Sequence, residues 1–147
     1  MNIREIEIDD LQGLLDLYRD LHEDEVPVSA DMAEPVWRDI QFNPDIKYFG
    51  VYDGDILLAS CNITIIPNLT RGCRPYGLIE NVVTVKAARR QGHGKAVLEH
   101  ALRYAWGLDC YKVMLLTGRL DAETFAFYEA AGFDRHGKQA FVARPAS

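Results

Sequence analysis

The spacing of apolar residues in the first 45 positions predicts one strand followed by two helices. Residues 3–8 alternate between two faces, which is typical of a short strand. Leucines recur at helical spacing over residues 10–22, and Asp10 can cap that helix. A second helix is predicted over residues 31–42. Four apolar side chains form its stripe: Met32, Val36, Trp37 and Ile40.

From residue 46 onward, strand-forming residues alternate with turns and two further helical segments. The tripeptide Asp53-Gly54-Asp55 separates two apolar runs and is typical of a hairpin turn. Residues 76–85 are dense in branched side chains and predict a central strand, which a loop over 67–75 precedes. The predicted strands are 46–52, 56–66, 76–85, 112–116 and 139–143, and the predicted helices are 94–106 and 122–131.

This order of elements predicts an α/β (α+β) fold in a single domain over residues 1–147. Strands joined by hairpins pair antiparallel, so most of the sheet should be antiparallel. The strand 76–85, the helix 94–106 and the strand 112–116 form a β-α-β unit, whose two strands should be parallel. We therefore expect a mixed, mostly antiparallel central sheet with helices on both faces.

Composition and charge exclude several classes of protein. The net charge of −6 argues against a nucleic-acid partner. No apolar run reaches the roughly 18 residues of a membrane span. The acidic first ten residues are unlike a signal peptide, so a cytoplasmic location is expected. Three cysteines and four histidines are scattered without the spacing of metal ligands, so no metal is expected.

One short segment departs from the acidic character of the chain. Residues 86–95 contain four lysines and arginines, one histidine, two glycines and no acid, directly before a predicted helix. Helix N-termini bind phosphate, and glycines allow a close backbone approach. A solvated basic turn would explain the charge equally well. The segment lacks the glycine spacing of a Walker A loop and the third small residue of a dinucleotide fingerprint, which disfavours a nucleotide-phosphate binder.

Two motifs together resemble the GNAT acetyltransferase superfamily. Arg89-Arg90-Gln91-Gly92-His93-Gly94 matches its [Gln/Arg]-x-x-Gly-x-[Gly/Ala] pyrophosphate loop. About 35 residues later, the segment 127–133 (FYEAAGF) matches the family's Tyr-Glu-x-x-Gly-Phe box. The resemblance covers roughly residues 46–143 and implies an N-acetyltransferase that uses acetyl-CoA as cosubstrate, with the strand before the loop splayed from its parallel neighbour.

The resemblance also implies which residues bind acetyl-CoA. The pantetheine arm would pair with backbone atoms of Val82, Val83 and Thr84. The amides from Gln91 to Lys95 would bind the pyrophosphate, with charge added by nearby cations. The loop residues implied are Arg89, Arg90, Gln91, Gly92, His93, Gly94 and Lys95. We expect the His93 side chain to be solvated.

Asp121 occupies a position where many family members place asparagine. An asparagine there can contact CoA through its side chain, whereas an aspartate can cap the following helix. Both roles are open for Asp121, and capping is the interpretation that we prefer.

Two side chains are candidates for proton transfer. By alternation, Glu80 shares a strand face with Leu78, Val82 and Thr84, where it could act as general base; it could equally be a surface glutamate in an ion pair. Glucosamine-phosphate acetyltransferases are similar here, with an acid pair where this chain has Glu80-Asn81. Tyr128 could protonate the departing thiolate, or simply pack beside aromatic neighbours.

The acceptor and the activity itself stay open. An amine on a small molecule or a peptide would bind between the helices 10–22 and 31–42 and the loop 67–75. A catalytically silent acyl-CoA sensor of the same fold is the alternative to an enzyme. A homodimer is expected only by family analogy.

Overall fold

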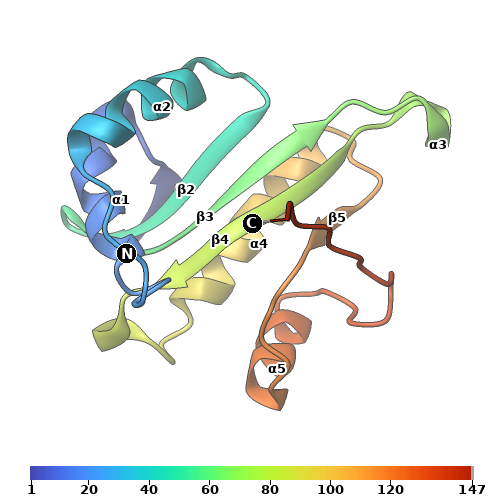
Figure 1. Cartoon of the computed structure of the whole chain (residues 1–147). Helices are drawn as coiled ribbons and strands as arrows, with labels where there is room; N and C mark the ends of the chain where they lie inside the picture. Colours follow the sequence, from blue (N-terminus) through green and yellow to red (C-terminus); the bar gives the residue numbers. More distant parts are fainter. Residues whose placement is uncertain (147) are drawn as a thin grey trace.

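The computed structural model describes residues 1–146 and has a five-stranded sheet in the order β1-β2-β3-β4-β5 (Figure 1). The strands are β1 (Asn2–Glu5), β2 (Ile46–Asp53), β3 (Ile56–Ile66), β4 (Tyr76–Thr84) and β5 (Val113–Leu115). The helices are α1 (Leu11–Tyr18), α2 (Ala30–Phe42), α3 (Thr70–Cys73), α4 (His93–Gly107) and α5 (Ala122–Ala130). Single 3-10 turns precede α1 and α4, over Ile8–Asp10 and Lys86–Ala88.

The strand pairing confirms the predicted mixed sheet. The three pairs from β1 to β4 are antiparallel, and β4 and β5 are parallel across α4. The hairpin turn after β2 places Gly54 at φ +58, a conformation that glycine adopts without a steric penalty. Sequential strands are therefore neighbours throughout the sheet.

Helices cover both faces of the sheet, as predicted. One buried cluster joins β2, β3 and β4 to α4, and the aromatic side chains of α5 pack against it. A second cluster lies under α1 and α2 and includes Ile6, Leu14 and Trp37. Figure 1 shows α4 behind the strands, with α1 and α2 grouped near β1 and β2.

The predicted last strand, over residues 139–143, is wrong. This segment has no regular secondary structure, and no backbone–backbone hydrogen bond joins residues 138–146 to the rest of the described chain. Phe141 is 90% exposed. Branched and aromatic residues favour a strand only where a neighbouring strand supplies partners, and this segment has none.

None of the helices over residues 1–146 combines the length and the apolar composition needed to cross a bilayer. Within the same residues, no three His, Cys, Asp or Glu side chains lie together as potential metal ligands.

Candidate active site

A β-bulge interrupts β4 at the point where the candidate base lies. Between the pairs Ser60↔Val83 and Asn62↔Glu80, β3 has one intervening residue and β4 has two. Asn81, the first of the two intervening residues of β4, has φ +54. Asparagine is among the few residues that visit this left-handed region readily, which explains its presence here.

The bulge corrects the predicted face of Glu80. Ile79 packs in the cluster under α4, so Glu80 lies on the α1–α2 face of the sheet. Beyond the bulge, Val83 belongs to the α1–α2 cluster and Val82 packs on the α4 side. Glu80 therefore shares its face with Val83, and Val82 and Thr84 lie on the other face. Strict alternation fails because the bulge inserts one residue.

The same stretch of β4 has an open edge on the side of β5. The parallel pairing comprises Gly77↔Val113, Leu78↔Met114 and Ile79↔Leu115, and the register ends there. Residues 80–84 continue β4 without a β5 partner. An open strand edge offers backbone N–H and C=O groups to a ligand. The residues predicted to pair with pantetheine, Val82 to Thr84, lie on this edge.

The loop after β4 connects this strand to the N-terminus of α4. Arg90 and Gly92 both have positive φ, at 64° and 85°. Gly92 is the N-cap of α4 and supplies no side-chain hydrogen bond, so the first amides of this 15-residue helix have no side-chain cap. These amides and the positive end of the helix dipole suit an anion. The predicted pyrophosphate ligands, Gln91 to Lys95, lie here.

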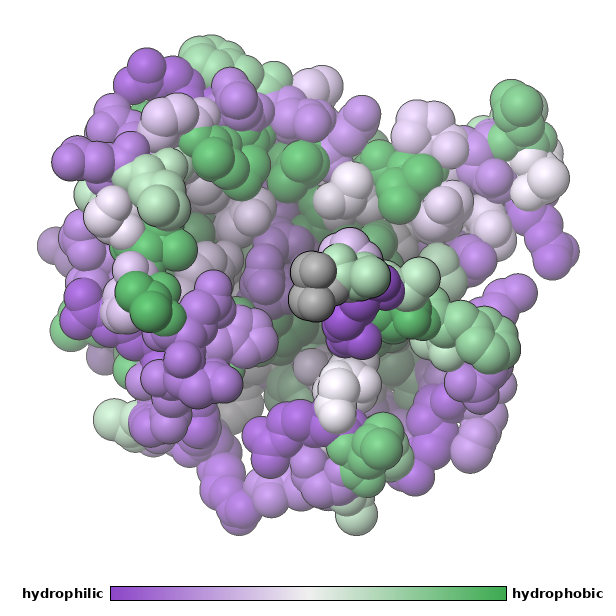
Figure 2. All heavy atoms as spheres, in the orientation of Figure 1, coloured by the Kyte–Doolittle hydropathy of each residue, from purple (hydrophilic) through white to green (hydrophobic). Residues whose placement is uncertain are grey.

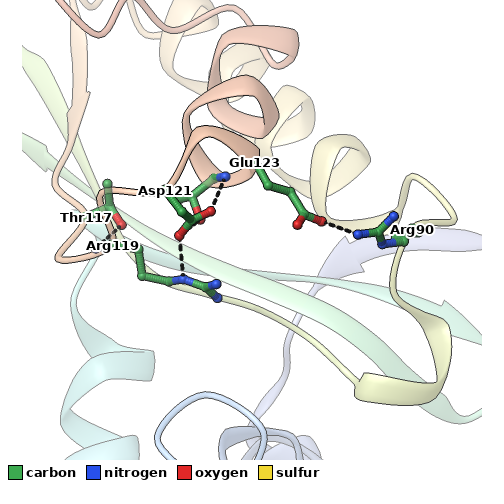
Figure 3. A network of polar contacts seen from close by, with 6 residues as sticks. Arg90, Thr117, Arg119, Asp121 and Glu123 are labelled. Atoms are coloured by element: carbon green, nitrogen blue, oxygen red, sulfur yellow. Dashed lines mark hydrogen bonds and ion pairs between the residues drawn. The ribbon is translucent and has the colours of Figure 1, made fainter.

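The three cations of the loop also have protein partners. Arg89 donates hydrogen bonds to the carbonyl oxygens of Thr84 (3.1 Å) and Asp20 (3.0 Å), which ties the loop to the end of α1. Arg90 forms an exposed 2.7 Å ion pair with Glu123 at the start of α5 (Figure 3). Lys95 lies 3.7 Å from Glu99. Arg89 thus has a positioning role, and Arg90 and Lys95 lie at the surface.

The expectation that His93 is solvated is wrong. His93 is the first residue of α4, its side chain is only 6% exposed, and its Nε2 has no hydrogen-bond partner among the described residues. Gly94 is required by packing: a Cβ there would lie 2.9 Å from Phe127 Cζ and 3.1 Å from Thr84 Oγ1. The missing side chain at Gly94 therefore lets α4 lie close to β4 and α5.

Asp121 is the N-cap of α5. Its carboxylate accepts a 2.8 Å hydrogen bond from the backbone N–H of Thr124 and lies 3.1 Å from Nε of Arg119 (Figure 3). The Thr124 hydroxyl also donates a hydrogen bond to this carboxylate. The two hydrogen bonds from Thr124, together with the Arg119 charge, hold the pKa of Asp121 below its ordinary value. The structure therefore gives Asp121 the capping role, and a contact with CoA stays a prediction.

The two candidate proton-transfer groups differ in environment. Glu80 is exposed. Tyr128 is half-buried between Phe127 and Phe133, with ring centroids 5.0 and 6.3 Å away. Burial raises the pKa of Tyr128, the Arg119 charge opposes this rise, and the Cys61 and Glu80 side chains add to it. Tyr128 thus stays protonated at neutral pH and lies within electrostatic reach of Glu80.

The model of the acetyltransferase (GNAT) family matches residues 11–133. The chain belongs to the GNAT acetyltransferase family. The matched range contains the bulge, the loop before α4 and the box on α5. The family assignment thus agrees with the resemblance carried by the two motifs.

Known proteins resemble this GNAT chain to different extents. A solved structure of a candidate acetyltransferase from Agrobacterium tumefaciens str. C58 is 40% identical, covers 99% of this chain and 100% of its own, and has a TM-score of 0.95. Glucosamine-6-phosphate N-acetyltransferase from Arabidopsis thaliana is 25% identical, over 99% of this chain and 98% of that one, with a TM-score of 0.81.

A curated relative, glucosamine 6-phosphate N-acetyltransferase from Trypanosoma brucei brucei, is 35% identical over 56% of this chain. The matched part spans about half of that relative, 54% of its length.

This GNAT chain has a pocket lined partly by residues 15–22, a region expected from the sequence to contact the acceptor, and partly by residues 23–28 and Asn81, which the sequence did not indicate. A cavity of about 330 Å³ lies between the end of α1, the chain over residues 19–28 and Asn81 of the bulge. Besides Tyr18, five polar or charged side chains line it: Arg19, His22, Glu23, Glu25 and Asn81. Residues 23–28 lie between two helices and carry no motif, so only the three-dimensional arrangement reveals them. The cavity lies on the face of the sheet that carries Glu80.

Proposed function

We propose that this chain transfers the acetyl group of acetyl-CoA to a primary amine. The observation that carries the proposal is the continuous path along β4, from the open edge at residues 80–84 to the uncapped N-terminus of α4. The open edge of β4 can pair with an extended pantetheine arm, and the N-terminus of α4 can bind a pyrophosphate. Two relatives support an amine acceptor, because glucosamine 6-phosphate, the substrate in their names, carries a primary amine.

The amine would approach from the cavity beside Asn81 and attack the thioester carbonyl carbon. A new N–C bond forms, the C–S bond breaks, and the amine loses one proton. Glu80 accepts that proton, directly or through a water molecule, because it lies beside Asn81 on the cavity side of β4. Tyr128 donates its phenol proton to the departing sulfur from the α5 side. Solvent then restores both groups.

Acetyl-CoA should raise the thermal stability of the protein. A ligand that binds only the folded state stabilises it by about 2.7 kcal/mol at a hundredfold excess over its dissociation constant. Differential scanning fluorimetry with acetyl-CoA, CoA and ATP measures this effect. We expect a shift with both CoA species. No shift with either of them would refute the proposed function.

Glu80→Gln should slow acetylation by roughly 30-fold near neutral pH, and by less at alkaline pH. General-base catalysis contributes about 10²–10⁴-fold, and Glu80 is exposed, so water can take over part of its role. At high pH the acceptor is already neutral and needs less assistance. A pH–rate profile of kcat/KM measures the effect.

The matched control for Glu80→Gln is Asp55→Asn, which removes an exposed carboxylate in the turn between β2 and β3. It should leave the profile unchanged. If Glu80→Gln also leaves the profile unchanged, Glu80 is a structural residue. A protein that binds acetyl-CoA and acetylates no amine would favour the silent sensor.

A further inference from the structure

An apolar pocket adjoins the cavity beside Asn81. It lies between α1 and α2, measures about 280 Å³, and has no charged residue in its lining. Leu11, Met32, Val36 and Ile40 are among the side chains that form it. Leu15, Tyr18 and Val28 line both pockets, so the apolar pocket continues directly from the polar one.

The outer wall of this pocket includes the two stripe residues of α2 that the protein core leaves exposed, Met32 and Val36. Of the four stripe residues of α2, Trp37 is buried, whereas Met32 is 69% and Val36 is 59% exposed. Figure 2 shows hydrophobic side chains gathered at the surface over α1 and α2. Removing apolar surface from water lowers the free energy, so the binding of an apolar ligand would be favourable here.

Tyr18 lines both pockets and carries a buried hydroxyl group. Its Oη has no hydrogen-bond partner among the described residues. Buried polar groups almost always have a partner, because an unmade hydrogen bond costs free energy. A ligand oxygen that meets this hydroxyl after a rotation of the Tyr18 side chain would supply that partner.

The polar pocket offers no excess of positive charge for a phosphate. Its lining contains two carboxylates, Glu23 and Glu25, with Arg19 and His22. Glu23 forms an ion pair with Lys86, which leaves Glu25 and Arg19 as opposite charges of equal number. A sugar phosphate, which carries two negative charges, therefore gains little electrostatic stabilisation here.

We propose that the acceptor is a primary amine carried on an apolar aliphatic or aromatic body. The amine lies in the polar pocket beside Asn81, and the apolar body lies between α1 and α2. The Tyr18 hydroxyl donates a hydrogen bond to an oxygen atom placed between them. This inference rests on the proposed acetyl transfer and makes Tyr18 and Val36 specificity-determining residues.

A panel of three amines tests the proposal. The amines are 4-phenylbutylamine, its ether isostere 2-(benzyloxy)ethylamine, and glucosamine 6-phosphate; release of free CoA thiol measures kcat/KM. We expect at least a tenfold preference for both aryl amines over glucosamine 6-phosphate, and a further preference for the ether, whose oxygen can accept from Tyr18.

Two variants separate the contributions of the pockets. Val36→Asp should lower kcat/KM for both aryl amines about tenfold, because it places a charge in the apolar pocket. Ile56→Asp, an exposed apolar position at the start of β3, is the matched control and should have no effect. Tyr18→Phe should abolish the preference for the ether over 4-phenylbutylamine, and the change should appear mainly in KM.

The failures of the two proposals are distinguishable. If glucosamine 6-phosphate is acetylated and the aryl amines are not, the acceptor class is wrong and acetyl transfer stands. If acetyl-CoA stabilises the protein and no amine of the panel reacts, the acceptor class is again wrong; acetyl transfer itself falls, in favour of the silent sensor, only if a broad range of other amines also gives no product. If acetyl-CoA gives no stabilisation and no amine reacts, the proposed function falls and this inference falls with it.

Discussion

Gly92→Val should lower the affinity for acetyl-CoA by about 100-fold. Gly92 has φ +85, and a non-glycine residue in the left-handed region costs about 1–2 kcal/mol. The loop would relax to relieve that strain and would move the first amides of α4. Hydrogen bonds to a charged group contribute about 1.5–3 kcal/mol each. Losing one or two of them accounts for the 100-fold loss, about 2.7 kcal/mol.

The control for this variant is Gly54→Val. Gly54 also has positive φ (58°), and a Cβ at either glycine meets no heavy atom within 4 Å. Gly54 lies in the turn between β2 and β3, outside the loop before α4. Both variants should lose similar stability by circular dichroism, and only Gly92→Val should lose affinity in calorimetric titration. Equal affinity in the two variants would refute the loop as the pyrophosphate site. Gly94 is a poorer probe, because its Cβ would collide with Phe127.

The parts of the fold set by local pattern could be predicted from the sequence. The hairpin at Gly54, the β-α-β unit and the start of α5 at Asp121 each depend on residues close in the chain. The position of the loop before α4 was also predictable, because a strand-forming run, two glycines and a helical run follow one another in the sequence. Its role as an anion site stays a prediction.

The remaining features depend on partners distant in the sequence. The bulge at Asn81 is a mismatch of register between β3 and β4. It cannot be predicted from the sequence of either strand alone. The segment 139–143 has the composition of a strand, but strand formation requires a neighbour with free hydrogen-bonding groups. The predicted stripe of α2 gave no indication that Met32 and Val36 would be exposed, since that depends on where α1 packs.

Tyr128→Phe should lower kcat by about 100-fold and leave the affinity for acetyl-CoA nearly unchanged. The change removes one hydroxyl, and the ring still packs between Phe127 and Phe133. Acetyl-CoA would be held mostly through its pantetheine and pyrophosphate, distant from this hydroxyl. The hydroxyl becomes important only as negative charge develops on sulfur, which is an interaction of the transition state. Loss of such an interaction lowers kcat and kcat/KM together.

The expected loss of kcat in Tyr128→Phe depends on the leaving group and on whether the Tyr128 phenol is protonated. Burial raises the pKa of Tyr128 above its ordinary value of 10.0, so the phenol keeps its proton at neutral pH and can donate it. General-acid catalysis contributes about 10²–10⁴-fold. A thiolate is a fair leaving group and water can partly replace the phenol, so the lower end is expected.

Two measurements test Tyr128→Phe. Steady-state kinetics with an accepted amine gives kcat, and calorimetric titration gives the affinity for acetyl-CoA. Tyr104→Phe is the matched control, because Tyr104 also packs on an aromatic ring, 5.4 Å from Phe49, and lies on α4 away from the open edge of β4. It should retain full turnover. Wild-type turnover in Tyr128→Phe would make Tyr128 a packing residue, because proton delivery to sulfur would then come from solvent.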